Sequence, residues 1–146
     1  MQTRLPFFQA NPAAMRALKS LDGQLAASTL EPALQELVRL RASQLNGCAY
    51  CMDVHTADAR RAGIDDRRLA LLPAWREAAL FSPRERAALL WTEDLTLVAD
   101  NHVPDASWQQ VREQFQDAEL VDLTLLITTI NAWNRFAIAF RKLPAG

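Results

Sequence analysis

The chain has 146 residues, half of them hydrophobic, and its 16 basic and 17 acidic side chains give a net charge of −1. A chain of this size is expected to form one domain over residues 1–146, and its scattered charges leave no basic stripe that would indicate binding to nucleic acid or to an anionic membrane. The first eight residues contain no apolar signal segment, which favours a cytoplasmic protein.

Caps and apolar periodicity predict helices almost throughout, and no alternating apolar and polar run is long enough to indicate a sheet. Helices are predicted in the first half over about residues 12–25, 30–45 and 48–62. Asn11-Pro12 caps the first of them, Asn46-Gly47 ends the second and Gly63 closes the third.

In the second half, helices are predicted over about residues 65–72, 83–98, 108–115 and 117–141. Pro73 ends the first of these, Ser82 and Glu85 form a capping box at the start of the second, and Asp117 is expected to cap the last. We predict that the last helix, which is apolar on most sides, is the central core helix, and its polar residues interrupt the run of about 20 apolar residues that a membrane span needs. The predicted fold class is all-α, with about six to seven helices.

The segment from Asn46 to His55 contains both cysteines and one of the two histidines of the chain. On a helix, Cys48, Cys51 and His55 project from one face. Residues three apart on a helix have Cα atoms about 5 Å apart, which a disulfide tolerates. In a reducing compartment this spacing favours a catalytic or metal-binding pair over a structural disulfide. The segment therefore predicts a redox-active dithiol.

The reactive form of such a dithiol is the thiolate, and the sequence offers two groups that stabilise it. A free cysteine with a pKa near 8.5 is only about 3% thiolate at pH 7. Making the thiolate dominant requires about 2.7 kcal/mol of preferential interaction with the anion. The start of a helix near Cys48 and the imidazole of His55 are the two sources.

Glu36 lies twelve positions before Cys48, and the stretch from Glu36 to His55 resembles the signature of the carboxymuconolactone decarboxylase superfamily, in its alkylhydroperoxidase D-like (AhpD-like) branch. Residues 81–86, 89–93 and 130–135 are similar to further segments of short members of that branch, so the resemblance covers about residues 30–140. It implies an all-helical AhpD-like fold that assembles into a homo-oligomer, commonly a trimer or a hexamer.

Carried over by position, the resemblance implies that Glu36 acts through a water on His55, that His55 takes the proton of Cys51, and that Cys48 completes the disulfide. The implied reaction is the reduction of an organic hydroperoxide through a sulfenic acid and a disulfide, which an external dithiol electron donor then reduces. No cofactor is needed beyond the redox-active disulfide.

The sequence leaves open which sulfur attacks, what Tyr50 does and which side chain Glu36 pairs with. The position of His55 favours Cys51 as the attacking sulfur, which we adopt, whereas exposure at the helix start favours Cys48. Some relatives carry histidine where this chain has Tyr50, so a second local proton carrier is missing; Tyr50 is expected either to pack or to line the substrate path. Glu36 is also placed to pair with Arg39.

The favoured function is a thiol-dependent peroxidase or disulfide oxidoreductase, and two other classes of function compete with it. Cys48, Cys51 and His55 are plausible zinc ligands, but a fourth ligand is missing nearby, so no metal site is predicted. The second alternative is a non-enzymatic oligomeric scaffold. Lactone decarboxylation is less favoured because the branch that performs it lacks the cysteine pair, and Met52 after the second cysteine excludes a c-type haem.

The remaining polar and aromatic residues have simpler interpretations. Asp58, one turn past His55, could orient the imidazole but is expected to be a surface charge, and His102 is expected to face solvent. The tryptophans Trp91, Trp108 and Trp133 are expected to be core or subunit contacts. Three polar side chains lie on the otherwise apolar last helix, namely Asn131, Asn134 and Arg135. They must be hydrogen-bonded or lie at an interface, and the sequence indicates no further role for them.

Overall fold

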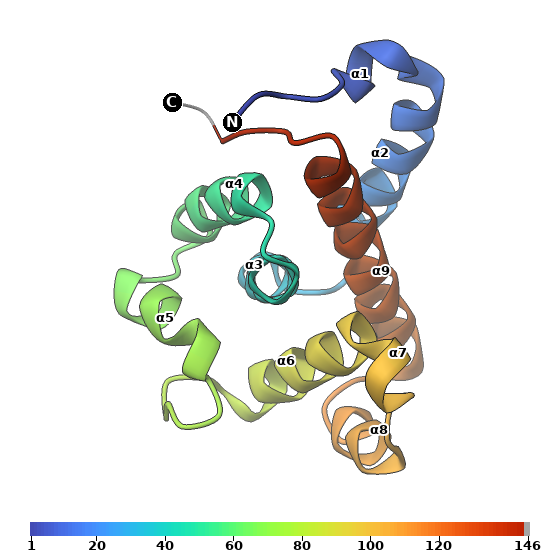
Figure 1. The fold of residues 1–146 in the computed structure, drawn as a ribbon. Coiled ribbons are helices and arrows are strands. Elements are labelled where there is room, and N and C mark those ends of the chain that lie inside the picture. Colours follow the sequence, from blue (N-terminus) through green and yellow to red (C-terminus); the bar gives the residue numbers. More distant parts are fainter. Residues whose placement is uncertain (145–146) are drawn as a thin grey trace.

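A computed structural model describes residues 1–144, and this part of the chain is helical with no strand (Figure 1). The elements in chain order are α1 (Phe7–Ala10), α2 (Pro12–Ala26), α3 (Pro32–Asn46), α4 (Ala49–Arg61), α5 (Asp66–Leu71), the 3-10 turn η1 (Leu72–Ala74), α6 (Pro83–Thr96), α7 (Val98–Asn101), α8 (Asp105–Arg112) and α9 (Asp117–Ala139). The all-α prediction is confirmed. Within the described residues, no helix is long and apolar enough to cross a membrane.

The described residues form nine α-helices rather than six to seven. The two that were not predicted, α1 and α7, have four residues each, which is too short for apolar periodicity to reveal them. The predicted helix over residues 83–98 ends at Thr96, and Val98 instead begins α7 with 47% of its surface exposed. Phe115 lies beyond the end of α8 but is buried in the core.

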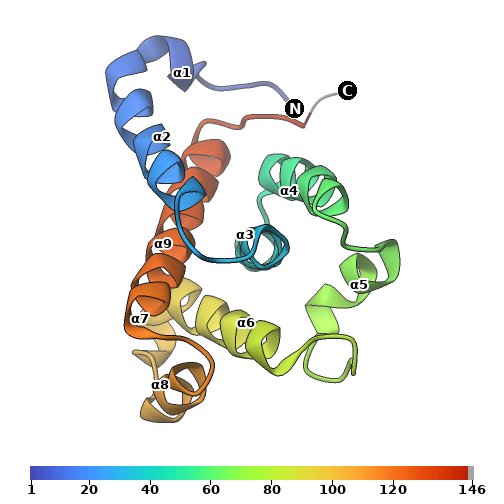
Figure 2. The same ribbon diagram turned by 180° about the vertical axis from the view of Figure 1, so that it is seen from behind.

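The central helix is α3, which both views show end-on with α4, α5, α6 and α9 around it (Figures 1 and 2). Val38 packs into a core cluster shared with α6, α8 and α9, while Leu37 and Leu40 pack into another shared with α5 and α6. The prediction that the last helix is central is wrong: α9 flanks α3, and its Val121 is 68% exposed.

Hydropathy misplaces the central helix because α3 contains charged side chains that are paired inside the fold. Arg39 pairs with Glu36 on the same helix, and Arg41 pairs with Glu93 on α6. A buried charge is tolerated when it has such a partner, so the polar residues of α3 do not mark a solvent-facing surface.

Capping interactions fix the helix ends close to where the sequence predicts them. The Asn11 side chain accepts the N–H of Ala14, and the capping box of Ser82 and Glu85 is present. The last helix is capped by Gln116 with Glu119 rather than by Asp117, which is its first residue and pairs with Arg112.

Candidate active site

The turn between α3 and α4 places both cysteines at one helix end. Gly47 ends α3 in the left-handed conformation, with φ of 67°, and the N–H of Cys48 then donates to Ser43 O at 3.0 Å. Cys48 caps α4, and its sulfur accepts the N–H of Cys51 at 3.3 Å. The geometry thus puts one sulfur at the positive end of the helix dipole, as the sequence predicts.

Cys48 and Cys51 are joined by a disulfide, with their Cα atoms 5.3 Å apart. Both are buried, at 1% and 4% exposure, and pack with Ala137 of α9 and Tyr50. Sulfurs bonded to each other are not thiolates, so the zinc set of Cys48, Cys51 and His55 does not exist in this state of the protein.

His55 and Glu36 are brought together across α4 and α3. Nδ1 of His55 lies 2.9 Å from Oε2 of Glu36, so the two groups are hydrogen-bonded directly. The expectation that a water links them is wrong, because this distance leaves no room for one. Arg39 donates to the other carboxylate oxygen of Glu36 at 2.5 Å, as its position three residues along the helix indicates.

The electrostatics of Glu36 follow from these contacts. Burial by itself raises the pKa of the Glu36 carboxyl, but the hydrogen bond from His55 and the positive charge of Arg39 lower it more, so that its pKa lies below the ordinary value. Glu36 is therefore an anion at neutral pH. An anion on Nδ1 fixes the imidazole tautomer and leaves Nε2 as the ring nitrogen that accepts a proton.

A cavity of about 450 Å³ contains this site. Its lining includes Cys51, His55 and Glu36, whereas Cys48 lies outside it. Most of the remaining wall is apolar and comes from α1, α4 and α9, namely Phe7, Phe8, Val54, Ile130, Trp133 and Ala137. Tyr50 packs against the disulfide, as one expectation has it, and also lines this cavity; its place on a substrate path stays a prediction.

Glu36, His55 and Asp58 place one ligand atom each within 4.8 Å of one another, the spacing of a metal cluster. Both oxygens of Glu36 are already engaged, by His55 and Arg39, and Asp58 pairs with Arg61. The hydrogen bond between His55 and Glu36, with the ion pair of Asp58 and Arg61 beside it, describes this trio better than a metal site does. Asp58 lies 4.0 Å from Nδ1 of His55, which is too far for a hydrogen bond, so a role for Asp58 in orienting the imidazole stays a prediction.

A buried amide network supports the cysteine turn, and the sequence indicated only that its members must be hydrogen-bonded. Asn46, two residues before Cys48, donates to Asn131 Oδ1 at 3.0 Å and to Asn134 Oδ1 at 2.8 Å. Asn134 is fully buried and donates to Ser43 Oγ at 3.0 Å. The network therefore ties the end of α3 to α9, and Arg135 joins it through Asn131.

The aromatic wall of the cavity is the part of the site that sequence reasoning missed. Phe7 and Phe8 belong to the unpredicted helix α1, and Trp133 donates from its indole nitrogen to Asp22 of α2 at 2.8 Å. No local motif marks Phe7 and Phe8, and the resemblance over residues 130–135 does not indicate that Trp133 lines this cavity. These side chains reach the cysteines only through the packing of α1 and α2 on α9. His102, by contrast, faces solvent as predicted.

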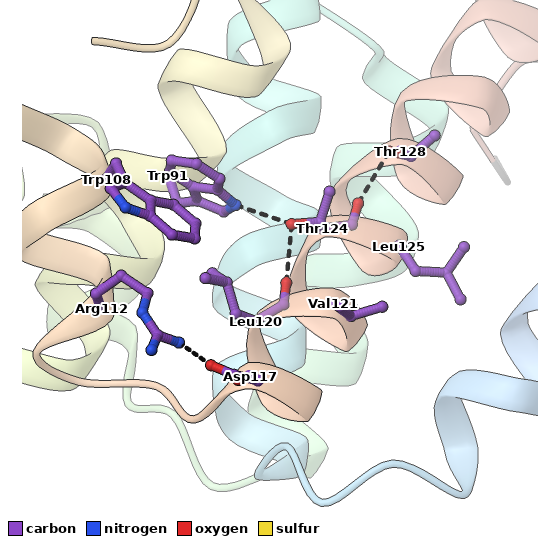
Figure 3. A pocket seen from close by; sticks show the side chains of 9 residues that line it. All are labelled: Trp91, Trp108, Arg112, Asp117, Leu120, Val121, Thr124, Leu125 and Thr128. Atoms are coloured by element: carbon purple, nitrogen blue, oxygen red, sulfur yellow. Dashed lines mark hydrogen bonds and ion pairs between the residues drawn. The ribbon is translucent and has the colours of Figure 1, made fainter. Parts of the chain in front are cut away.

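A second apolar hollow of about 500 Å³ lies between α6, α8 and α9, at the end of the molecule away from α4 (Figures 1 and 3). The indole of Trp91 donates to Thr124 at its base, and Arg112 pairs with Asp117 at its edge (Figure 3). Trp91 is buried, whereas Trp108 is 46% exposed. No cysteine or histidine is among the described residues that line it, so this hollow is separate from the redox site.

Known proteins are similar to this chain in sequence and in fold. The family model of the carboxymuconolactone decarboxylase family matches residues 12–94. The uncharacterized protein YdfG of Bacillus subtilis (strain 168) is 39% identical over 95% of each chain. A protein of unknown function from Agrobacterium tumefaciens, suggested to be the antioxidant defence protein AhpD, is 36% identical with a TM-score of 0.96 over 99% of both chains. A peroxidase-related protein of Ralstonia eutropha JMP134 with an alkylhydroperoxidase AhpD core is 22% identical with a TM-score of 0.83, over 95% of this chain and 74% of that one.

Proposed function

The chain belongs to the carboxymuconolactone decarboxylase family, within the AhpD-like superfamily, and from this membership we propose that it is a thiol-dependent peroxidase that reduces organic hydroperoxides. One observation carries the proposal: Cys51, His55 and Glu36 line the same cavity, with His55 hydrogen-bonded to Glu36 and Cys51 bonded to Cys48. A nucleophile, a base and a group that orients the base are the parts that activated-thiol catalysis needs.

In the proposed cycle Cys51 is the attacking residue, because it shares the cavity with His55. His55 takes the proton of the reduced Cys51 thiol, and the thiolate attacks the peroxide, which breaks the O–O bond. This step leaves a sulfenic acid on Cys51 and releases an alcohol once the leaving oxygen receives the proton from His55. The Cys48 thiol then displaces water from the sulfenic acid and restores the disulfide. An external dithiol reduces it again, which suits a reducing compartment such as the cytoplasm.

The cavity wall favours a hydroperoxide with an apolar substituent over hydrogen peroxide. Phe8 and Trp133 stack with ring centroids 5.9 Å apart, and Val54 and Ile130 extend the apolar surface. A volume of about 450 Å³ suits a small organic molecule. Burial of an apolar substituent contributes about 25 cal/mol per Å² that hydrogen peroxide cannot obtain.

The proposal is tested by dithiothreitol-dependent turnover of cumene hydroperoxide, with circular dichroism as a check on folding. Either Cys48→Ser or Cys51→Ser should abolish turnover while the helical content is retained. Asp53→Asn is the matched control, because Asp53 is exposed on α4 and lies outside the cavity. Full turnover in both cysteine variants would refute the proposal. In that case stoichiometric zinc in protein purified without chelator would favour the metal-binding alternative, and its absence would favour the non-enzymatic member.

We also propose that the protein assembles with copies of itself through the hollow between α6, α8 and α9. The apolar side chains at this hollow include Trp108 and Val121, which are 46% and 68% exposed. The ion pair at its edge, between Arg112 and Asp117, is satisfied within the chain (Figure 3). Large exposed apolar patches mark interaction sites. Light scattering should give a mass above that of one chain, and Val121→Glu should lower it; a monomeric wild-type protein would overturn this assignment.

A further inference from the structure

The disulfide separates two cavities, each lined by only one of the two cysteines. Cys51 lines the cavity that also holds His55, and Cys48 lines another cavity of about 390 Å³. Tyr50 and Ala137 form part of the wall of both. The two sulfurs are therefore approached from different sides, although they are bonded to each other.

The cavity at Cys48 is positively charged. Three basic residues, Arg4, Arg141 and Lys142, line it, and none of its described lining residues is acidic. Arg4 donates to the carbonyl of Ala139, and the ammonium of Lys142 lies 4.6 Å from the ring centre of Tyr50. Among the described residues no carboxylate pairs with these three side chains, whereas arginines such as Arg39 and Arg41 have carboxylate partners. A cavity with several uncompensated positive charges attracts an anion.

Reduction of the disulfide by an external thiol can begin at Cys48, from the cavity that Cys48 lines. An external thiolate that attacks Cys48 Sγ forms a mixed disulfide with Cys48 and releases Cys51 Sγ as a thiolate. The released sulfur then lies in the cavity of His55, which supplies a proton acceptor and donor beside it. A second thiolate attacks the reductant sulfur of the mixed disulfide, so that the reductant leaves as its own disulfide. The two protons lost by the reductant end on Cys48 and Cys51.

We propose that the cavity at Cys48 is the binding site of the reductant and that it selects small thiols bearing a negative charge, such as a carboxylate. The inference rests on the proposed redox cycle, which requires that the disulfide be reduced from outside. It assigns the two sulfurs to different partners: Cys51 meets the peroxide, and Cys48 meets the reductant. The charge of Arg4, Arg141 and Lys142 then determines which reductants react fast.

The test is a single-turnover reduction of the oxidised protein in the absence of peroxide. Mercaptosuccinate, 2-mercaptoethanol and cysteamine serve as anionic, neutral and cationic probes, and each rate is divided by the thiolate concentration. The wild-type protein should react about tenfold faster with mercaptosuccinate than with cysteamine, because a basic cleft raises the local concentration of anions. The double variant Arg141→Gln and Lys142→Gln should lose most of this preference. Arg67→Gln, an exposed arginine on α5, is the matched control and should keep it.

The position of attack is read from the mixed disulfide trapped by acid quenching and located by tandem mass spectrometry. The adduct should lie on Cys48. An adduct on Cys51, equal rates for the three probes, or a preference that survives in the double variant would overturn the inference. Its failure is distinct from that of the peroxidase proposal, because no peroxide is present. If reduced protein turns over cumene hydroperoxide without any charge preference among thiols, only this inference fails; if the preference is found without peroxide turnover, only the peroxidase proposal fails.

Discussion

His55 Nδ1 and Glu36 Oε2 lie 2.9 Å apart, although the two residues are 19 positions apart in the chain and belong to different helices. This contact exists because α4 turns back along α3 after Gly47, so that the cysteine helix presents its histidine to the carboxylate of the central helix. Arg39 holds the same carboxylate from the other side. The imidazole is thus oriented before any substrate arrives, which lowers the ordering cost of the reactive geometry.

Glu36→Gln keeps the shape of this contact and removes its charge. The amide no longer stabilises an imidazolium, so we expect the alkylation rate of reduced Cys51 at pH 7 to fall about tenfold, and His55→Gln to lower it about 100-fold, within the range of general-base effects. The pH of half-maximal alkylation should move upward in both variants. Peptide-level alkylation with iodoacetamide measures both effects, with Asp53→Asn as control. Unchanged rates would remove the relay from the mechanism.

Protonation of Glu93 is expected to destabilise the fold in acid. It is buried on α6 and accepts hydrogen bonds from Trp75 at 2.7 Å, from Arg41 at 2.8 Å and from Arg76. Burial raises the pKa of the Glu93 carboxyl, but these three partners outweigh it and bring the pKa below its ordinary value of 4.5. Because its pKa is lower in the folded than in the unfolded chain, Glu93 contributes stability above pH 4.5, and this contribution is lost as the pH falls through the folded pKa.

Glu93→Gln should therefore lower the free energy of unfolding at pH 7 by about 3 kcal/mol, since it leaves Arg41 without its buried partner. When the pH is lowered from 6 to below the folded pKa of Glu93, the free energy of unfolding of the variant should fall less than that of the wild-type protein. Urea titrations followed by circular dichroism at each pH measure this difference. Glu113→Gln, at an exposed position on the surface, is the control and should change neither quantity. If the free energy of unfolding falls equally steeply with falling pH in both proteins, the assignment to Glu93 is contradicted.

The sequence predicts the parts of this molecule that local chemistry encodes. Gly47 ends a helix because glycine takes its φ of 67° without a steric penalty, and Ser82 with Glu85 forms the capping box at the start of α6. The spacing of Cys48 and Cys51 fixes a Cα separation close to the 5.3 Å observed. Such features depend on residues within one turn of each other, so no knowledge of the tertiary fold is required.

What the sequence does not predict depends on distant partners. Glu36 reaches His55 directly, and no spacing rule distinguishes this from a contact through water. Phe8 meets Trp133 only because α1 and α2 fold back on α9. The central helix α3 contains Arg41, whose charge is neutralised by Glu93 on α6, so the burial of α3 is visible only once both helices are placed.

The amide network beneath the cysteine turn yields a stability prediction. Asn134→Leu removes the donor to Ser43 and the acceptor for Asn46, both of which are then left without this partner in a buried site. The free energy of unfolding should fall by about 1–3 kcal/mol, the usual penalty for unsatisfied buried polar groups. Combining Asn134→Leu with Ser43→Ala should cost less than the sum of the single variants, because each single change already breaks the hydrogen bond between Asn134 and Ser43. Additive losses in urea denaturation would show that the network is not coupled.

Replacing glycine with alanine is expected to change the free energy of unfolding in opposite directions at Gly23 and Gly47. Gly23 lies inside α2, where an added Cβ meets nothing within 4 Å, so Gly23→Ala should raise the free energy of unfolding by up to about 1 kcal/mol through helix propensity. Gly47 has equally open space around it, but its φ of 67° is unfavourable for alanine, so Gly47→Ala should lower the free energy of unfolding by about 1 kcal/mol. Because Gly47 precedes Cys48, Gly47→Ala should also slow disulfide formation in the reduced protein, measured by thiol titration after a pulse of peroxide, whereas Gly23→Ala should not. Equal effects of the two substitutions would mean that the left-handed turn between α3 and α4 does not position the cysteines.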